Sequence, residues 1–294
     1  MNMRKVFINN RSKTFLAITI PIVLLFFAFN TMAVIQGFGY SLTNFRGFGS
    51  FQFVGLRNYI DLFSDSRVIN SYIFTFGFAI VCTILVNVIS LILALGLNSK
   101  IRAKGALRAI YFLPNILGGL VIGYVFNFFF TYILPAIGKA VGSGALSNSL
   151  LASPKTAWFA LVICVSWQSI AMNTLIYISG LQTVPEDVYE AGEIDGAVGF
   201  KKFKNITFPL IMPFFTINMV LCMKNFLMVF DQIVSLTGGG PARSTESISY
   251  LIYNGGLSGG AFGYQSANAV IFFIVILIIS VFQLKFLGKK EEQL

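Results

Sequence analysis

The most regular feature of the chain is a series of long stretches without a charged side chain. No Asp, Glu, Lys or Arg occurs within five stretches of 30 residues or more, namely 14–45, 68–99, 109–138, 156–185 and 247–284. A helix needs about 20 apolar residues to cross the ~30 Å of hydrocarbon in a bilayer. A sixth apolar stretch, 206–234, is interrupted by Lys224 and Asp231.

These stretches predict an all-α protein, a polytopic membrane helical bundle of about six transmembrane helices. Backbone polar groups in hydrocarbon must be satisfied within the segment, which favours helices. We expect one membrane domain over 1–294, because no polar linker divides the chain. The first apolar stretch is interpreted as a retained anchor and not as a secretory signal, because it is long and no clear cleavage site follows it. The expected spans are 14–38, 72–97, 109–134, 157–179, 206–234 and 267–287.

Composition and charge support a membrane location. Hydrophobic residues make up 56% of the chain and charged residues 11%, against about 25% charged in soluble domains. Of the 21 Lys and Arg residues, fourteen fall at the two termini and in the loops at 98–108 and 180–205, six fall in the opposite loops, and Lys224 falls in a span. By the positive-inside rule, both termini are predicted to be cytoplasmic, and the net charge of +10 needs no nucleic acid.

Several chemistries are excluded or disfavoured by the residue types. The chain has no His, so it has no imidazole for acid–base catalysis or metal binding. Cys82, Cys164 and Cys222 fall inside predicted spans without C-x-x-C spacing, which is typical of buried apolar thiols. The sequence Gly138-Lys139-Ala140 lacks the spacing of a phosphate loop. No metal site or resident cofactor is expected.

Polar and small residues recur within two of the spans. Asn115, Gly119, Gly123 and Asn127 are four residues apart and would share one helix face, with Gly119-x-x-x-Gly123 at the spacing of close helix packing. In the fifth span, polar side chains recur at seven-residue steps on one side. Polar side chains in a span face the bundle interior or a water-filled cavity. The members of this set are Asn218, Lys224, Asn225, Asp231 and Gln232.

The segment from Leu181 to Pro213 predicts a short acidic helix at about 185–196, between two spans. Pro185 suits a helix start, and Glu186 and Asp187 place negative charge near its positive end. Apolar side chains then recur at three-residue steps and would form a docking edge. An ordinary solvated loop helix remains an alternative on these grounds alone.

This segment resembles the EAA loop of binding-protein-dependent ABC importer permeases. Glu190, Ala191, Gly196, Ile206 and Pro209 stand at the positions of that pattern. Two positions depart from it, Gly192 in place of the second Ala and Phe208 in place of Leu. A Gly in a helix costs about 1 kcal/mol against Ala, so Gly192 predicts a looser helix. "EIDGA", 193–197, is similar to the carbohydrate-uptake branch.

The resemblance extends over about residues 15–287 and points to maltose- or glycerol-phosphate-type sugar permeases. Its further segments are "FVGLRNY" (53–59), "RAIYFLP" (108–114), "VFD" (229–231) and "LTGGGP" (236–241). It implies a permease without catalysis of its own, in the cell membrane of a bacterium. The implied partners are a second homologous permease, two copies of an ATPase subunit that binds ATP and Mg²⁺, an extracellular sugar-binding protein, the sugar and the lipid bilayer. No nucleic acid is expected.

The resemblance implies one set of site residues, and the glycine loop and the polar residues of the spans predict two more. Contact with the ATPase is expected at Glu190, Ala191, Gly192, Asp195, Gly196 and Ala197. Contact with the binding protein is expected at Gly238, Gly239, Gly240 and Pro241. The substrate path is expected at Trp167, Gln168, Asn173, Asn218, Lys224, Asn225, Asp231 and Gln232, with Trp167 as a flat face for a sugar ring. The alternative for the amides is that they join helices to one another.

Other functions stay open to different degrees. The substrate is expected to be an oligosaccharide, with glycerol-phosphate or a polyol as the alternative. An ion-coupled secondary transporter is disfavoured, because such proteins usually contain both halves in one chain. A membrane-embedded enzyme is disfavoured, because Lys224 and Asp231 alone are poor acid–base equipment.

Overall fold

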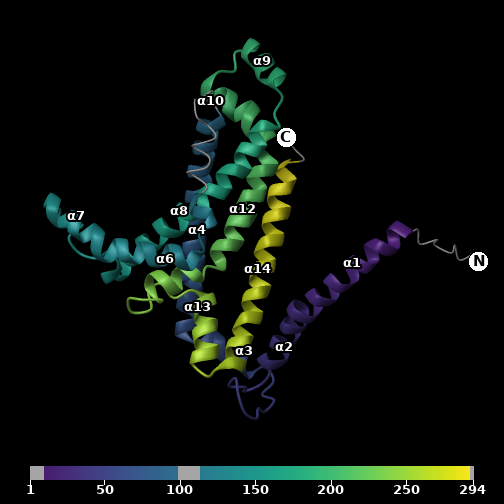
Figure 1. Ribbon diagram of the computed structural model, residues 1–294, viewed down its shortest axis with the longest axis vertical. Coiled ribbons are helices and arrows are strands. Elements are labelled where there is room, and N and C mark those ends of the chain that lie inside the picture. Colours follow the sequence, from purple (N-terminus) through teal and green to yellow (C-terminus); the bar gives the residue numbers. More distant parts are fainter. Residues whose placement is uncertain (1–9, 99–112, 292–294) are drawn as a thin grey trace, which may run out of the picture. The chain divides into compact units, whose positions relative to one another are not determined.

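The computed structural model describes residues 10–98 and 113–291, which divide into two compact units (Figure 1). One unit holds residues up to 62 together with 254–271, and the other holds 63–253 and the residues from 272 onwards. The described residues are helical apart from turns, loops and one isolated bridge between Thr43 and Phe53. The basic N-terminal residues before 10, the basic loop around 100–108 and most of the 108–114 motif lie outside the described residues.

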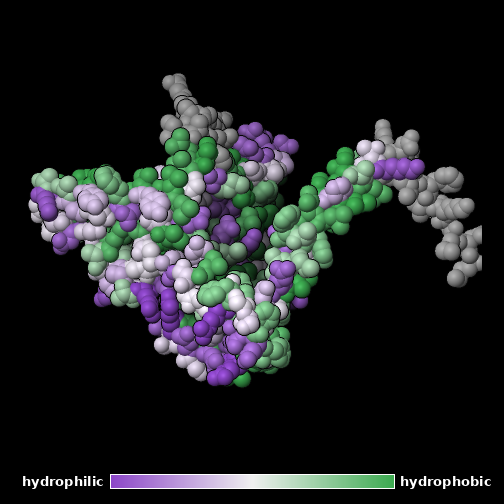
Figure 2. Space-filling view, turned by 60° about the horizontal axis from the view of Figure 1, so that its bottom comes forward, coloured by the Kyte–Doolittle hydropathy of each residue, from purple (hydrophilic) through white to green (hydrophobic). Residues whose placement is uncertain are grey.

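The first unit begins with a long apolar helix. It runs from α1 (Asn10–Phe26) through a π-helical turn, η1 (Phe27–Thr31), into α2 (Met32–Ser41), and its 29 residues from Lys13 to Ser41 are apolar enough to cross a membrane. The large side chains on it are exposed, and the space-filling view shows it hydrophobic along its length (Figure 2). A helix that is apolar all round requires an apolar surrounding such as hydrocarbon.

The loop after α2 packs on the start of the last helix, α14 (Phe262–Glu291). The Asn58 amide, on α3 (Arg57–Ser64), donates to the Ser41 carbonyl at the end of α2, at 2.8 Å, and to the Thr43 carbonyl just after it, at 2.9 Å. The Gly263 N–H donates to the Phe45 carbonyl at 2.7 Å, and a Cβ at Gly263 would overlap backbone of this loop. Gly263 therefore allows a backbone approach that another residue would block.

The core of the second unit lies where three long helices meet: α4 (Ser66–Asn98), α8 (Pro154–Gln182) and α12 (Met212–Leu227). All three cysteines are buried in this core, as the sequence predicted. Other buried core residues on the same helices are Phe78, Val86, Leu161, Val165, Phe226 and Leu227.

Shorter elements lie between α4 and α8, between α8 and α12, and between α12 and α14. They are α6 (Gly119–Phe128), η2 (Phe129–Ile133), α7 (Leu134–Val141), η3 (Leu150–Ala152), α9 (Glu186–Ile194), α10 (Gly199–Lys202), η4 (Phe203–Thr207), α11 (Phe208–Leu210), η5 (Ile233–Thr237), α13 (Ile248–Tyr253) and η6 (Asn254–Ser258).

The predicted fold class is confirmed. Five helices among the described residues are long and apolar enough to span a membrane, and a bent pair brings the number to six. The five are Lys13–Ser41, Ser66–Asn98, Gly119–Val141, Pro154–Gln182 and Phe262–Lys289. The cytoplasmic placement of both termini stays a prediction.

The fifth predicted span, 206–234, was wrong as a single helix. The chain bends by 72° between Gly199–Leu210 and Met212–Leu227. Pro213 has no N–H to bond the carbonyl four residues earlier, and Ile211 leaves the helical region with φ −94° and ψ 6°. A second break follows Leu227, where the Val229 carbonyl accepts a hydrogen bond from the Ser247 hydroxyl at 2.9 Å. The predicted straight polar row is therefore divided into parts.

The third predicted span, 109–134, also needs correction. Its first residues lie outside the described part of the chain, and Gly118 is extended with φ −64° and ψ 147° before α6 begins. Asn115 therefore precedes a break and does not share the helix face of Gly119, Gly123 and Asn127.

Candidate functional site

A polar pocket of about 490 Å³ lies between α8, α12 and the chain that follows α12. Five of the predicted path residues line it: Gln168, Asn173, Asn225, Asp231 and Gln232. The other three, Trp167, Asn218 and Lys224, do not. The remaining lining residues are Asn115, Val165, Ser169, Met172, Ile176, Leu221, Phe226, Met228, Val229 and Phe230.

Amide side chains form a connected wall of this pocket. The Gln232 Nε2 donates to the Gln168 Oε1 at 2.7 Å, and the Gln168 Nε2 donates to the Leu117 carbonyl at 3.0 Å. The Asn173 Nδ2 donates to the Ser169 carbonyl within α8 at 2.8 Å. These bonds hold the amides in place, while the Asn225 side chain is exposed at the pocket and has no hydrogen-bond partner among the described residues.

The small residues of α6 bring that helix against the segment that carries Asp231. A Cβ at Gly119 would lie 2.8 Å from the Asp231 Cβ and 2.9 Å from the Gln232 Nε2, and one at Gly123 would overlap the Ser235 side chain. The Asn127 Nδ2 donates to the Leu236 carbonyl at 2.7 Å. The prediction of close helix packing at Gly119 and Gly123 is confirmed.

The ionisable side chains of the pocket region are unpaired within the described chain. The Asp231 carboxylate lines the pocket, is exposed and has no ion pair or hydrogen bond with another described residue. Lys224, in the last turn of α12, is also exposed and unpaired there, but it does not line the pocket. No Lys or Arg occurs among the described residues that line it.

Two of the predicted path residues pack against neighbouring helices instead. Asn218 is 0% exposed, and its Nδ2 donates to the Asn173 carbonyl at 3.1 Å. The Cys222 thiol donates to the Asn173 Oδ1 at 3.0 Å, so both residues join α12 to α8. Trp167 is partly exposed and packs on Phe126, with ring centroids 5.3 Å apart. For Asn218 the geometry is the one expected of an amide that joins helices.

The acidic helix expected at 185–196 is present as α9. Pro185 precedes it in an extended conformation, with φ −61° and ψ 144°, and Glu186 and Asp187 lie in its first turn. It ends at Ile194, Gly196 follows with a φ of +75°, and the Ala197 N–H donates to the Gly192 carbonyl at 2.8 Å. Glycine is the residue that adopts this left-handed conformation at least cost.

The six residues expected at the ATPase contact separate into two groups. Gly192 and Ala197 are buried, and a Cβ at Gly192 would overlap the end of the Ile206 side chain. This contact explains Gly in place of the family's second Ala. The exposed members are Glu190, Ala191, Asp195 and Gly196.

Large apolar side chains around α9 are exposed. Ile194 is 87% exposed and Phe200 is 77% exposed, and Val198 is exposed between them. Beside them the Lys202 Nζ donates to the Glu193 carboxylate at 2.7 Å and lies 4.5 Å from the centre of the Tyr189 ring. This hydrogen bond lowers the pKa of Glu193. Exposed apolar side chains grouped in this way mark an interaction surface.

The "LTGGGP" loop is tightly folded. Gly238 and Gly239 have φ of +57° and +79°, and a Cβ at Gly239 would lie 2.9 Å from the Tyr250 ring. The Thr245 hydroxyl donates to the Gly240 carbonyl at 2.7 Å. Gly240 and Pro241 border a second pocket of about 370 Å³. Of the four residues expected to meet a binding protein, Gly239 is buried and Gly238 is exposed.

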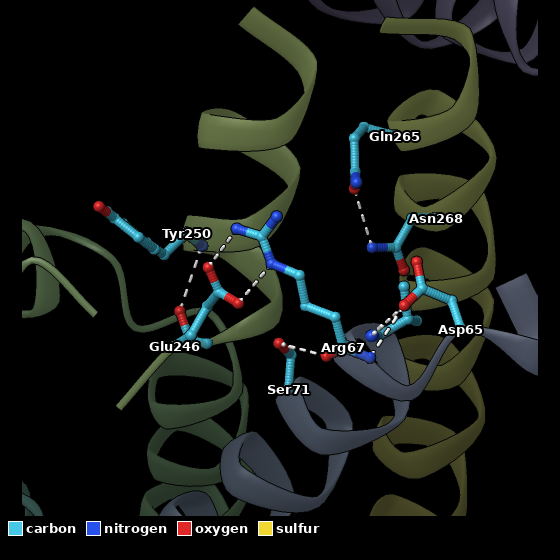
Figure 3. A network of polar contacts seen from close by, with 9 residues as sticks. Asp65, Arg67, Ser71, Glu246, Tyr250, Gln265 and Asn268 are labelled. Carbon is cyan, nitrogen blue, oxygen red and sulfur yellow. Dashed lines mark hydrogen bonds and ion pairs between the residues drawn. The ribbon is translucent and has the colours of Figure 1, made fainter. Parts of the chain in front are cut away.

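An ion pair that sequence reasoning missed fixes the end of this loop (Figure 3). The Arg67 Nε and Nη2 donate to the two Glu246 carboxylate oxygens at 2.8 and 2.7 Å, across 179 residues of sequence. The Glu246 side chain is 4% exposed and that of Arg67 is 33% exposed. The Asp65 carboxylate accepts the Arg67 N–H at 2.8 Å and so caps α4. The sequence feature that could have pointed to this pair is its position, because Arg67 and Glu246 each come directly before a long charge-free stretch.

Helices long and apolar enough to cross a membrane surround a polar pocket, and an exposed short helix lies between two of them, which is the arrangement expected of a membrane transport protein. The chain belongs to the family of binding-protein-dependent transport system inner membrane components, whose model matches residues 87–291. It is therefore a multi-pass permease component of the inner membrane.

Relatives and a solved structure agree with this family. The chain is 37% identical over 293 residues to the multiple sugar-binding transport system permease protein MsmF of Streptococcus mutans, covering 99% of this chain and 100% of MsmF. It is 35% identical over 234 residues to the trehalose/maltose transport system permease protein MalF of Thermococcus litoralis, covering 79% of each. The fold matches a chain of the bacterial alginate ABC transporter, crystallised with its periplasmic protein bound to an alginate pentasaccharide, with a TM-score of 0.82 over 96% of each chain at 20% identity.

Proposed function

We propose that this chain is the transmembrane permease subunit of an ATP-binding-cassette importer that moves a sugar, an oligosaccharide in the first instance, into the cytoplasm. An extracellular binding protein would deliver the sugar. A second homologous permease would complete the path, and two ATPase subunits would bind ATP and Mg²⁺. The permeases MsmF and MalF, whose names refer to sugar transport, support this proposal.

The observation that carries the proposal is the amide-rich pocket among membrane-crossing helices. Its volume of about 490 Å³ is within the ~300–1,000 Å³ typical of small-molecule sites. Gln168, Asn225 and Gln232 can each donate and accept hydrogen bonds, as sugar hydroxyls do. The Trp167 and Phe126 rings lie outside the lining, so we place sugar contacts on the amides first.

Coupling to the ATPase is proposed at α9 and the residues after it. Glu190 is exposed and unpaired within the described chain, so it is available to a basic residue of the ATPase. Ile194, Val198 and Phe200 supply apolar area that burial against a partner would stabilise. Gly192 contributes from within, because Ile206 packs on it and ties α9 to the segment that leads into α12.

Uptake by whole cells tests the proposal. Deleting the gene for this chain should abolish energy-dependent uptake of at least one probe from a panel of maltotriose, raffinose and trehalose, and a plasmid copy should restore it. Uptake of sn-glycerol-3-phosphate alone would favour the alternative substrate. Uptake of every probe unchanged by the deletion would contradict the proposed function.

A charge reversal tests the coupling surface. Glu190→Lys should abolish uptake and release the ATPase during co-purification, while membrane insertion stays normal, because a like charge against a basic partner repels it. Asp61→Lys is the matched control, since Asp61 is exposed on α3 and carries no predicted contact with the ATPase. Normal uptake by Glu190→Lys would contradict this assignment.

A further inference from the structure

We infer that the second pocket, beside the "LTGGGP" loop, binds the saccharide at a subsite separate from the amide-rich pocket. The inference rests on the proposed function and adds to it a second place on this chain where the sugar is held. The pocket has a volume of about 370 Å³, within the ~300–1,000 Å³ typical of small-molecule sites. Its lining residues are Asn127, Thr131, Ser149, Leu151, Ala152, Leu236, Thr237, Gly240 and Pro241.

The two pockets share one wall, which is formed by α6 and by the chain after α12. Gly119, at the start of α6, lies against Asp231 and Gln232, which line the amide-rich pocket. The Asn127 Nδ2, further along α6, donates to the Leu236 carbonyl at 2.7 Å, and both residues line the second pocket. Gly119 and Asn127 are about 12 Å apart along the helix, at about 1.5 Å per residue. The second pocket therefore lies along the same wall, toward the loop that is predicted to meet the binding protein.

Three polar side chains of the second pocket retain hydrogen-bonding capacity that the described chain does not use. The Thr131 hydroxyl is half-buried and has no hydrogen bond to another described residue. Asn127 uses only its Nδ2, which leaves its Oδ1 as a free acceptor. The Ser149 hydroxyl oxygen accepts the Leu151 N–H at 3.2 Å and keeps its own hydrogen to donate. Free donors and acceptors gathered at one pocket suit sugar hydroxyls, which donate and accept at once.

The fourth polar side chain, Thr237, serves the loop and not the pocket. Its hydroxyl donates to the Ile233 carbonyl at 3.3 Å and accepts the Thr245 hydroxyl at 2.8 Å and the Gly239 N–H at 3.3 Å. We therefore assign the ligand contacts to the other three.

The composition of the lining favours a saccharide over a side chain of the binding protein. None of the described residues that line the pocket is charged or aromatic. Protein partners are usually anchored by aromatic or Arg side chains, which need an apolar pocket or a carboxylate. Here hydroxyl and amide groups alternate with aliphatic carbon, which matches the hydroxyls and C–H groups of a sugar. The aliphatic members are Leu151, Ala152, Leu236 and Pro241.

Protection of an introduced thiol measures whether sugar occupies this pocket. Ala152 lines it, is exposed and can be replaced by Cys, while the three native cysteines are buried. In the assembled transporter in nanodiscs, without binding protein, at least one of maltotriose, raffinose and trehalose should slow labelling of the Ala152→Cys thiol by a neutral maleimide. Adding Thr131→Val removes a free hydroxyl, so the sugar concentration that gives half-protection should rise about threefold to tenfold.

Two controls separate sugar binding from a change of structure. Thr31→Val makes the same exchange on η1, at a half-buried hydroxyl that has no hydrogen bond to a described residue and lines neither pocket, so it should leave half-protection unchanged. Ser169→Cys places the thiol in the amide-rich pocket instead. Half-protection of that thiol should not change when Thr131→Val is added.

The outcomes separate the inference from the proposed function. The inference is overturned, while sugar uptake stands, if a sugar protects Ser169→Cys and none protects Ala152→Cys. Protection of Ala152→Cys by the sugar-free binding protein and by no sugar assigns the pocket to that protein and overturns it as well. Half-protection at Ala152→Cys that Thr131→Val leaves unchanged, or raises equally at both thiols, also counts against it. If no sugar protects either thiol, the inference falls together with the saccharide site of the proposed function.

Discussion

The ion pair between Arg67 and Glu246 makes a sharp prediction, because its two members differ in burial. Removing Arg67 as Arg67→Met leaves the Glu246 carboxylate, 4% exposed, without its counter-charge. An uncompensated buried charge costs about 3–5 kcal/mol of the free energy of unfolding. Removing the other partner as Glu246→Gln leaves an Arg side chain that is 33% exposed and partly hydrated. We therefore expect this variant to lose only about 1–2 kcal/mol of the free energy of unfolding, because it loses hydrogen bonds to a charged group.

The assay combines unfolding with proteolysis. In thermal unfolding of the purified permease in one detergent, the wild type should be the most stable, Glu246→Gln less stable and Arg67→Met the least stable. Arg67→Met/Glu246→Leu should recover most of the loss, because no buried charge remains. Trypsin should cut faster after Arg243, which is exposed in the loop that the pair fixes, in both single variants.

A control pair and an opposite ranking complete the test. Asp61→Asn removes an Arg57 pair that is 3.8 Å long and mostly exposed, so it should cost less than about 1 kcal/mol. Equal losses of unfolding free energy in Arg67→Met and Glu246→Gln would refute the argument from burial. A loss in Arg67→Met no larger than that in Asp61→Asn would refute it as well.

Three further predictions follow from backbone and packing geometry. Gly123→Ala should lower both assembly and uptake, because its Cβ would overlap Ser235. Gly77→Ala should lower neither, because nothing lies within 4 Å of a Cβ there. Co-purification with the partner subunits measures the assembly of both variants. Gly239→Ala should destabilise the protein by about 1–2 kcal/mol, because the backbone at residue 239 is left-handed. Gly240→Ala should destabilise it less, because the φ of Gly240 is not positive. Thermal unfolding should show this order, and the reverse order would contradict the prediction. An impermeant thiol reagent added outside intact cells should label Ser258→Cys and not Lys201→Cys, both exposed positions; the opposite pattern would invert the predicted topology.

Local physical rules predicted the helices but not the breaks within them. Long charge-free stretches predicted the spans, because hydrocarbon permits few other backbone states. Pro209 and Pro213 were visible in the sequence, yet a proline alone does not fix the size of a bend, which is 72° here. The break near Val229 depends on the Ser247 hydroxyl, which lies 18 residues away.

Side-chain roles in the pocket were predictable only in part. The seven-residue spacing pointed to Asn225, Asp231 and Gln232, which line the pocket, because polar groups in a span avoid lipid. It grouped Asn218 with them, and only the packed structure shows that Asn218 joins α12 to α8. Contacts such as Arg67–Glu246 lie beyond any periodic pattern, since their members are far apart in the chain.

The arrangement of the pocket has a consequence for how its specificity can evolve. Asn218 and Cys222 hold two helices together, so replacing either disturbs the bundle. Asn225 and Asp231 are exposed and carry no side-chain hydrogen bond to another described residue. Substitutions at Asn225 can change the chemistry of the pocket while leaving helix packing intact. At Asp231 the same holds for side chains no larger than Asp, because Asp231 lies against Gly119 of α6. Under the proposed function, divergence to a new cargo is therefore expected to begin with single substitutions at residues 225 and 231.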